Sequence, residues 1–147
     1  MSEFCTRVET ETSPEETWRR LWDLDRHTAV IPLTTVTPHP PATRLGPGVC
    51  FTGRTALGSL GFDDEMRVVE WSPPVGEGGG RAVVDKVGRV VGGRIEVTVV
   101  PSRHGSLVTW RQTVRLPWLP RPLRWVEALA ARIVAPGYRR AIRTLLA

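Results

Sequence analysis

The last quarter of the chain constrains its fold more than any other stretch. Residues 121–147 predict one long amphipathic helix, because apolar side chains recur at helical spacing while most of the arginines fall outside that stripe. The expected stripe consists of Val126, Leu129, Ala130, Ile133, Ala141, Ile142 and Leu145. Between Pro32 and Pro117 the sequence favours strands instead. A long helix beside a strand-rich chain has to bury its stripe against a sheet.

Runs of alternating side chains divide the rest of the sequence into strands. Residues 3–12 alternate, with Phe4, Thr6 and Val8 on one side, which predicts a first strand. The motif SPEE at 13–16 predicts a helix start, because serine caps a first turn and proline fits its first position. A second short helix or turn is expected at 24–31, followed by about six strands. Because short turns force antiparallel pairing, the predicted class is α+β, with helices on one face of a curved antiparallel sheet.

Length and composition are those of an ordinary globular protein. The 147 residues suit a single domain, 1–147, with one core. The N-terminus lacks a signal-peptide pattern, and no apolar run is long enough to cross a membrane, so we expect a cytoplasmic protein. Cys5 and Cys50 are expected to be reduced, partly buried thiols. The three histidines have no metal-binding spacing and the glycine tract lacks a phosphate-loop lysine, so neither metal nor cofactor is expected.

Four motifs resemble those of one protein family. They are SPEETW at 13–18, VVEWSPP at 68–74, the approach from Gly105 into VTW at 108–110, and YRRAIR at 138–143. In this order, over nearly the whole chain, they look like the polyketide cyclase/dehydrase and lipid-transport family of the START-like, helix-grip superfamily, which includes the birch-pollen-allergen fold. The resemblance implies a seven-stranded antiparallel sheet gripping the C-terminal helix, with two short helices after the first strand and a cavity between sheet and helix. Family members bind lipids, polyketides, sterols or hormones, and a minority catalyse cyclisation or dehydration.

Two residues of the terminal helix depart from the helical pattern. Pro136 removes one backbone hydrogen bond and is followed by Gly137, so the helix is expected either to kink or to split there.

Strand alternation assigns the side chains that would line the cavity. Trp110 and Gln112 share the face of the last strand expected to meet the helix, and the side of the 62–71 strand taken as inward carries Phe62, Asp64, Met66, Val68 and Glu70. The expected ligand contacts are Phe51, Thr55, Met66, Val68, Val97, Val99, Trp110, Gln112, Val126, Leu129 and Ile133.

Three polar residues on these faces bear on function. Gln112 is the most informative, because a buried amide needs partners; it fits either a ligand pocket or a satisfied core. Asp64 and Glu70 would be costly to bury unpaired, so they either sit at the rim or act as functional acids.

Three functions remain open from the sequence. The first is binding of a hydrophobic small molecule, lipid or polyketide-like, between sheet and helix. The second is a cyclase/dehydratase-type enzyme in the same cavity, with Asp64 or Glu70 and a histidine as acid and base. The third is a domain with a filled core that serves as a binding surface for a partner.

The arginines of the terminal helix raise the question of whether it binds nucleic acid or a membrane surface. They fit a solvated helix face better than a nucleic-acid interface, so no nucleic acid is expected. Trp118 and Trp125 beside Arg121 and Arg124 indicate a transient contact with a membrane surface. A monomer and a homodimer are both compatible with the sequence.

Overall fold

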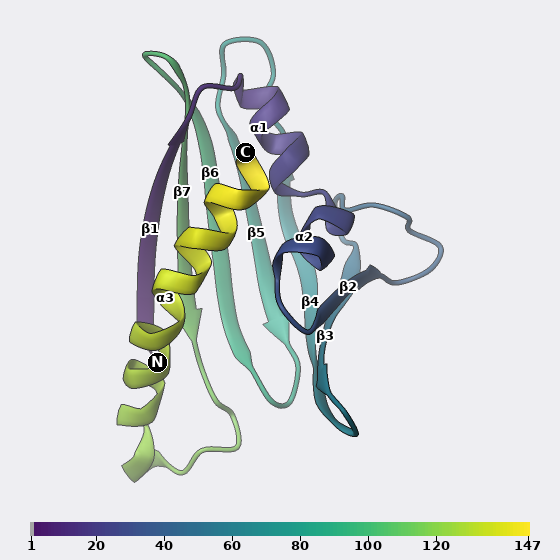
Figure 1. The fold of residues 1–147 in the computed structure, drawn as a ribbon, viewed down its shortest axis with the longest axis vertical. Helices are drawn as coiled ribbons and strands as arrows, with labels where there is room; N and C mark the ends of the chain where they lie inside the picture. The colour runs from purple at the N-terminus through teal and green to yellow at the C-terminus, as the bar shows by residue number, and fades with distance from the viewer. Residues whose placement is uncertain (1) are drawn as a thin grey trace.

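Residues 2–147, which the computed structural model describes, form a seven-stranded antiparallel sheet and three α-helices (Figure 1). In chain order the elements are β1 (Ser2–Thr10), α1 (Pro14–Leu21), α2 (Leu24–Val30), β2 (Thr34–Pro38), β3 (Cys50–Leu57), β4 (Leu60–Ser72), β5 (Gly80–Val87), β6 (Gly92–Ser102), β7 (Gly105–Val114), a 3-10 turn (Arg121–Leu123) and α3 (Trp125–Leu146). The strand order is β1-β7-β6-β5-β4-β3-β2. The expected α+β class, with two short helices after the first strand, is confirmed.

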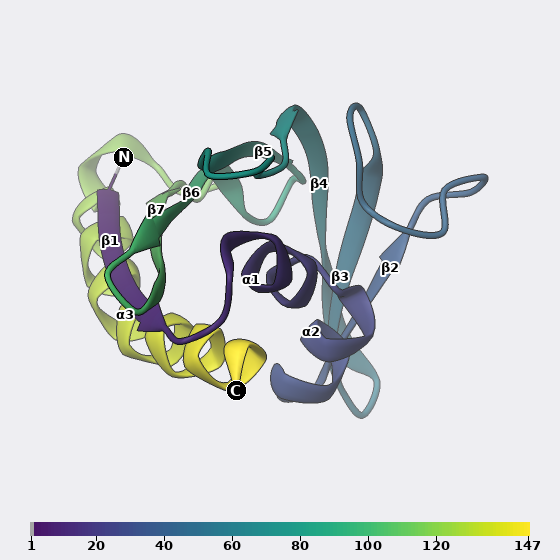
Figure 2. The ribbon, with the colours of Figure 1, turned by 90° about the horizontal axis from the view of Figure 1, so that it is seen from above.

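The sheet curves around α1, and the helices cover its concave face (Figure 2). α3 packs along β1 and also contacts β7, α1 and α2. The concave face supplies most of the core, because alternate side chains of each strand point toward the helices. Ser13 begins α1 as expected: its hydroxyl accepts a hydrogen bond from the Glu16 N–H at 3.3 Å.

A β-bulge in β4 changes which of its side chains face inward. Met66 and Val68 are buried on the concave side, as the alternation predicts. The pairing register with β5 then shifts between Val68 and Glu70. Glu70 is consequently exposed on the convex face beside Arg81, while Trp71 packs against the core. The inward placement of Glu70 was wrong, because a bulge inserts one extra residue and reverses the alternation beyond it.

The expected phase of the terminal helix was also partly wrong. Ile142 and Leu145 are buried as predicted, but Leu129 and Ile133 are 48% and 68% exposed. Val126 is only half-buried. The helix instead turns a face with small side chains toward β1, and there Ala131 is buried. Alanines allow a close approach between helix and strand, so the larger aliphatic side chains of this half point to solvent.

The Pro136–Gly137 step does not split the helix. α3 runs as one helix from Trp125 to Leu146, four residues later than its predicted start, with Pro136 inside it. Its start is held from the β7 side, where the buried Glu127 carboxylate accepts a hydrogen bond from the Leu116 N–H at 2.9 Å. That bond is the main reason why the pKa of Glu127 is lowered.

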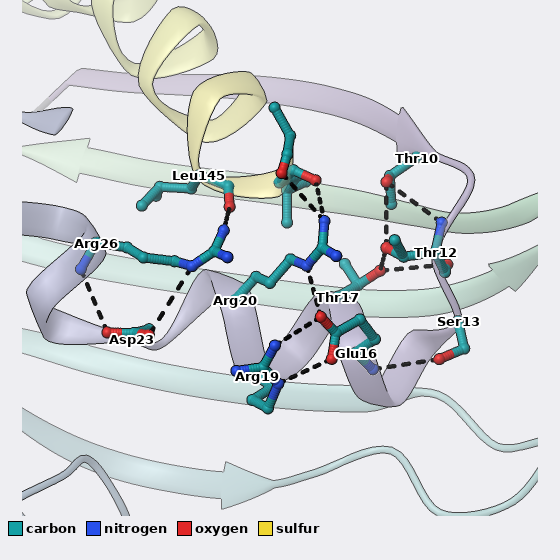
Figure 3. Close-up of polar contacts among 12 residues, drawn as sticks. Thr10, Thr12, Ser13, Glu16, Thr17, Arg19, Arg20, Asp23, Arg26 and Leu145 are labelled. Atoms are coloured by element: carbon teal, nitrogen blue, oxygen red, sulfur yellow. Dashed lines mark hydrogen bonds and ion pairs between the residues drawn. The ribbon is translucent and has the colours of Figure 1, made fainter. Parts of the chain in front are cut away.

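Two arginines hold the other end of α3 (Figure 3). Arg20 of α1 donates to the carbonyls of Leu146 and Ala147 at 3.0 and 3.1 Å, and Arg26 of α2 donates to that of Leu145 at 2.8 Å. Carbonyls in the last turn of a helix lack intrahelical donors and carry partial negative charge, so guanidinium groups suit them. Both ends of α3 are thus attached to the rest of the fold.

Candidate functional site

A row of aromatic rings crosses the concave face from α1 to β1. Neighbouring ring centres along the row are 5.0–6.0 Å apart, which is normal for packed aromatic pairs. In order, this aromatic row consists of Trp18, Trp71, Trp22, Trp110, Tyr138 and Phe4. These rings lie between sheet and helices, where the family resemblance implies a cavity.

A polar cluster lies beside the row. The Trp110 indole Nε1–H donates to Gln112 Oε1 at 3.1 Å, and Gln112 Nε2 donates to the Tyr138 hydroxyl at 3.4 Å. Lys86 Nζ forms an ion pair with Asp64 Oδ2. Gln112 and Lys86 are only 2% and 5% exposed. We refer to Asp64, Lys86, Gln112 and Tyr138 as the polar cluster.

Lys86 remains charged in this setting. Burial by itself would lower the pKa of its ammonium group, but the proximity of Tyr138 and Asp64 outweighs burial and raises that pKa above its ordinary value. The Lys86 ammonium therefore acts as a fixed positive charge and hydrogen-bond donor, and not as a neutral amine nucleophile.

The polar cluster contains hydrogen-bond donors that have no acceptor within the described residues. Within residues 2–147, no acceptor is found for the Tyr138 hydroxyl hydrogen, and Lys86 uses one of its three N–H groups. The buried Trp22 Nε1–H likewise has no partner, and neither has one acceptor, Asp64 Oδ1. Unpaired buried groups such as Trp22 Nε1 and Asp64 Oδ1 are uncommon inside proteins, where water or a ligand usually satisfies them, and the half-buried Tyr138 hydroxyl is free to donate to either. An excess of donors favours an oxygen acceptor as the missing partner.

An open groove runs between β1 and α3, next to this cluster. Its volume is about 620 Å³, within the usual range of small-molecule sites. Phe4, Ala131 and Ala135 form apolar walls, and Arg132 and Arg139 lie at the rim. The Phe4 ring lines the groove, and its centre lies 5.3 Å from that of the Tyr138 ring.

The predicted ligand contacts fall into three groups. Most are buried together on the concave face: Phe51, Met66, Val68, Val97, Val99, Trp110 and Gln112. Thr55 lies apart, in a second hollow of about 330 Å³ near the β3–β4 turn, and bonds to Thr34 at 2.9 Å. Val126, Leu129 and Ile133 do not join the concave set, because α3 turns its other face to the sheet.

Sequence reasoning missed four residues of the site, namely Lys86, Tyr138, Trp22 and Trp71. Lys86 continues the inward alternation of Ala82 and Val84, but a lysine usually marks the solvent side of a strand. Tyr138 lies four residues before the buried Ile142 on one helix face, a spacing that the correct helix phase would have shown.

The described residues do not bring together the other sites considered from the sequence, namely an acid–histidine pair and a metal site. Asp64 pairs with Lys86 instead of a histidine, and His27 bonds to the Leu21 carbonyl at 2.6 Å. Burial lowers the pKa of His27. Residues 2–147 contain no group of three potential metal ligands. Cys5 and Cys50 are free thiols, Cys5 being exposed and not partly buried as expected.

Within the described part of the chain, no helix is both long and apolar enough to span a bilayer.

Sequence comparison gives no relative. No protein-family model matches the chain, and no curated protein matches it in sequence.

Solved structures do match the fold. TTHA0849 from Thermus thermophilus is similar over 97% of this chain and 93% of its own, with a TM-score of 0.69 and 17% identity. Ara h 8.0201 is similar over 98% and 96%, with a TM-score of 0.65 and 11% identity. The di-domain ARO/CYC StfQ from the steffimycin biosynthetic pathway is similar over 98% of this chain, with a TM-score of 0.70 and 12% identity; the match spans 49% of StfQ. These likenesses establish the architecture that the motifs suggested: the chain has the helix-grip fold of the START-like and birch-pollen-allergen-like proteins.

Proposed function

We propose that this protein binds a hydrophobic small molecule, lipid or polyketide-like, that carries an oxygen acceptor at one end. The apolar part lies in the groove between β1 and α3, against Phe4 and Ala131. The oxygen reaches the Tyr138 hydroxyl when the Phe4 ring moves aside. The observation that carries this proposal is a donor-rich polar cluster, with Gln112 and Lys86 buried among apolar side chains and Tyr138 in contact with the Phe4 ring that lines the groove.

The chemistry of the cluster supports an oxygen-bearing ligand over a plain hydrocarbon. A ligand carbonyl or carboxylate would accept from the Tyr138 hydroxyl, with the Lys86 ammonium near enough to influence Tyr138 electrostatically. Arg132 and Arg139 at the rim would also favour a molecule with a negative end. Fold likeness to Ara h 8.0201 and to StfQ is compatible with this role and does not name the ligand.

A second candidate function is a cyclase/dehydratase-type reaction in the same site. The Lys86–Asp64 ion pair beside Tyr138 favours it, because a fixed ammonium stabilises an enolate oxygen and a nearby carboxylate accepts a proton. The ARO/CYC label of StfQ supports the same interpretation. Asp64 and Lys86 replace the predicted pairing of Asp64 or Glu70 with a histidine.

Native mass spectrometry of the purified protein tests binding, and variants locate the site. Ala128 lines the groove with an exposed side chain, so Ala128→Trp should fill the groove without disturbing the core. We expect the wild type to retain an apolar compound that Ala128→Trp and Gln112→Leu retain at least about tenfold less. Ala29→Trp, at an exposed position of α2, is the matched control and should bind like the wild type.

The same experiment separates the alternatives. A compound recovered unchanged after incubation indicates a carrier, and a compound that has lost water or gained a ring indicates an enzyme. Absence of any bound apolar compound, or equal binding by Ala128→Trp and Ala29→Trp, would contradict the proposed site.

A further inference from the structure

The first half of α3 exposes large apolar side chains on the face that points away from the fold. Trp125 is 63% exposed and stands in line with Leu129 and Ile133, because side chains four residues apart share one helix face. Ala131 and Ile142 mark the opposite, buried face. In Figure 1 these first turns of α3 project beyond the start of β1. We call Trp125, Leu129 and Ile133 the outer stripe.

The charge around the outer stripe is of one sign. α3 carries exposed arginines at 132, 139, 140 and 143, and none of them forms an ion pair within residues 2–147. The one acidic residue of the helix, Glu127, is buried and bonded to Leu116. By contrast, four arginines of the strands form ion pairs, as Arg94 does with Asp85 at 2.7 Å; the others are Arg54, Arg81 and Arg111. The exposed side of α3 is therefore apolar and cationic together.

We propose that this side of α3 docks on an anionic lipid surface, with the outer stripe at the level of the headgroups. Tryptophan and aliphatic side chains on one helix face, flanked by arginines, are the composition of helices that lie in a membrane interface. Anionic headgroups attract the unpaired arginines, and this attraction weakens with salt. The proposal does not depend on whether the interior holds a ligand.

Charge and side-chain type argue against other occupants. A second copy of the chain would bring two cationic helices together, which like-charge repulsion disfavours. Single-stranded nucleic acid would match the charge but gains affinity by stacking successive bases on several aromatic rings, and the outer stripe offers a single ring, Trp125, beside two aliphatic side chains.

Vesicle co-sedimentation of the full chain tests this docking surface. We expect binding to phosphatidylcholine vesicles that contain phosphatidylserine, little binding to phosphatidylcholine alone, and release by added salt. Leu129→Ser with Ile133→Ser should weaken binding by about tenfold or more, because both side chains would leave water on docking. Arg140→Gln with Arg143→Gln should weaken it by about tenfold as well.

Matched controls use exposed residues elsewhere. Leu60→Ser, at the start of β4, and Arg103→Gln, in the β6–β7 turn, should bind vesicles like the wild type. Because all substituted side chains are exposed, circular dichroism should show unchanged folding. Equal binding by the outer-stripe variant and the wild type would overturn the proposal. So would phosphatidylserine-independent binding, a dimer that the same variant dissociates, or tighter binding to single-stranded DNA than to vesicles.

Discussion

Lys86 shows how much a single buried residue depends on its partner. Its ammonium group is almost wholly enclosed and is neutralised by the Asp64 carboxylate. A buried ion pair contributes little net stability, but the loss of one partner leaves an uncompensated charge inside the protein. The pair is therefore tolerated only as a unit.

This dependence predicts an asymmetric effect of substitutions. Asp64→Leu should lower the free energy of unfolding by about 3 kcal/mol, because Lys86 then loses its counter-charge. Asp64→Leu combined with Lys86→Met should recover most of that loss, since an apolar pair of similar volume needs no neutralisation. Urea denaturation at neutral pH measures both. A single variant as stable as the wild type, or a double variant as unstable as the single one, would show that the pair is not coupled in this way.

The burial of a side chain could be predicted from the sequence where it depends on residues close to it in the same strand. Gln112 was expected on the inward face, and it is buried there with two polar partners. Lys86 was not predictable, because its burial depends on Asp64 and Tyr138, which lie on other elements. The sequence pattern of β5 alone therefore does not predict that Asp64 and Tyr138 lie beside Lys86.

Among the elements, α3 depends on contacts from outside itself. Its last carbonyls are bonded by Arg20 and Arg26, which belong to α1 and α2. In α1, Glu16 accepts hydrogen bonds from Arg19 and Arg20, in that order of importance, and they lower its pKa to about 2. The carboxylate thus helps to hold Arg20 toward the end of α3.

Removing either capping arginine should loosen the end of α3. Arg20→Gln and Arg26→Gln should each lower the free energy of unfolding by about 1 kcal/mol, because charged hydrogen bonds to the helix carbonyls are lost. Arg19→Gln is the matched control, since Arg19 bonds to Glu16 and not to α3. Thermal denaturation with hydrogen exchange of residues 140–146 measures the effect. An equal loss in Arg19→Gln would mean that the α1 ion pairs, and not the caps, provide the stability.

Elements were predicted well in type and less well in phase. Strand alternation is a local property, so it gave the correct inward set for β7 and grouped Phe4, Thr6 and Val8 of β1 on one side, where all three are buried. The bulge after Val68 has no local signal in β4 and reversed Glu70 and Trp71. In α3, large aliphatic side chains indicated the wrong face, because close packing on β1 uses alanines instead.

At the scale of the whole molecule, the order of elements determined the fold. The first strand in the chain, β1, pairs with the last strand, β7, and forms one edge of the antiparallel sheet. The terminal helix α3, which follows β7, therefore packs against β1. The groove could not be predicted residue by residue, because its two walls come from opposite ends of the chain. Its position depends on the phase of α3, which the sequence left undetermined.

The two faces of α3 therefore have different proposed roles. The inner face closes a groove beside the polar cluster, and the outer face presents an apolar and cationic surface. For the inner face we propose that an apolar molecule with an oxygen acceptor reaches Tyr138 and Gln112.

Two-dimensional nitrogen–proton NMR of side-chain signals, during titration with oleate below its micelle concentration, tests binding at this site. We expect saturable shifts of the Trp110 indole and Gln112 amide signals, since both groups belong to the network that ends at Tyr138. The exposed Trp118 indole, which donates to the Val90 carbonyl at 3.0 Å, should stay unchanged. Shifts confined to Trp118 and Trp125, or no saturable shift at all, would contradict it.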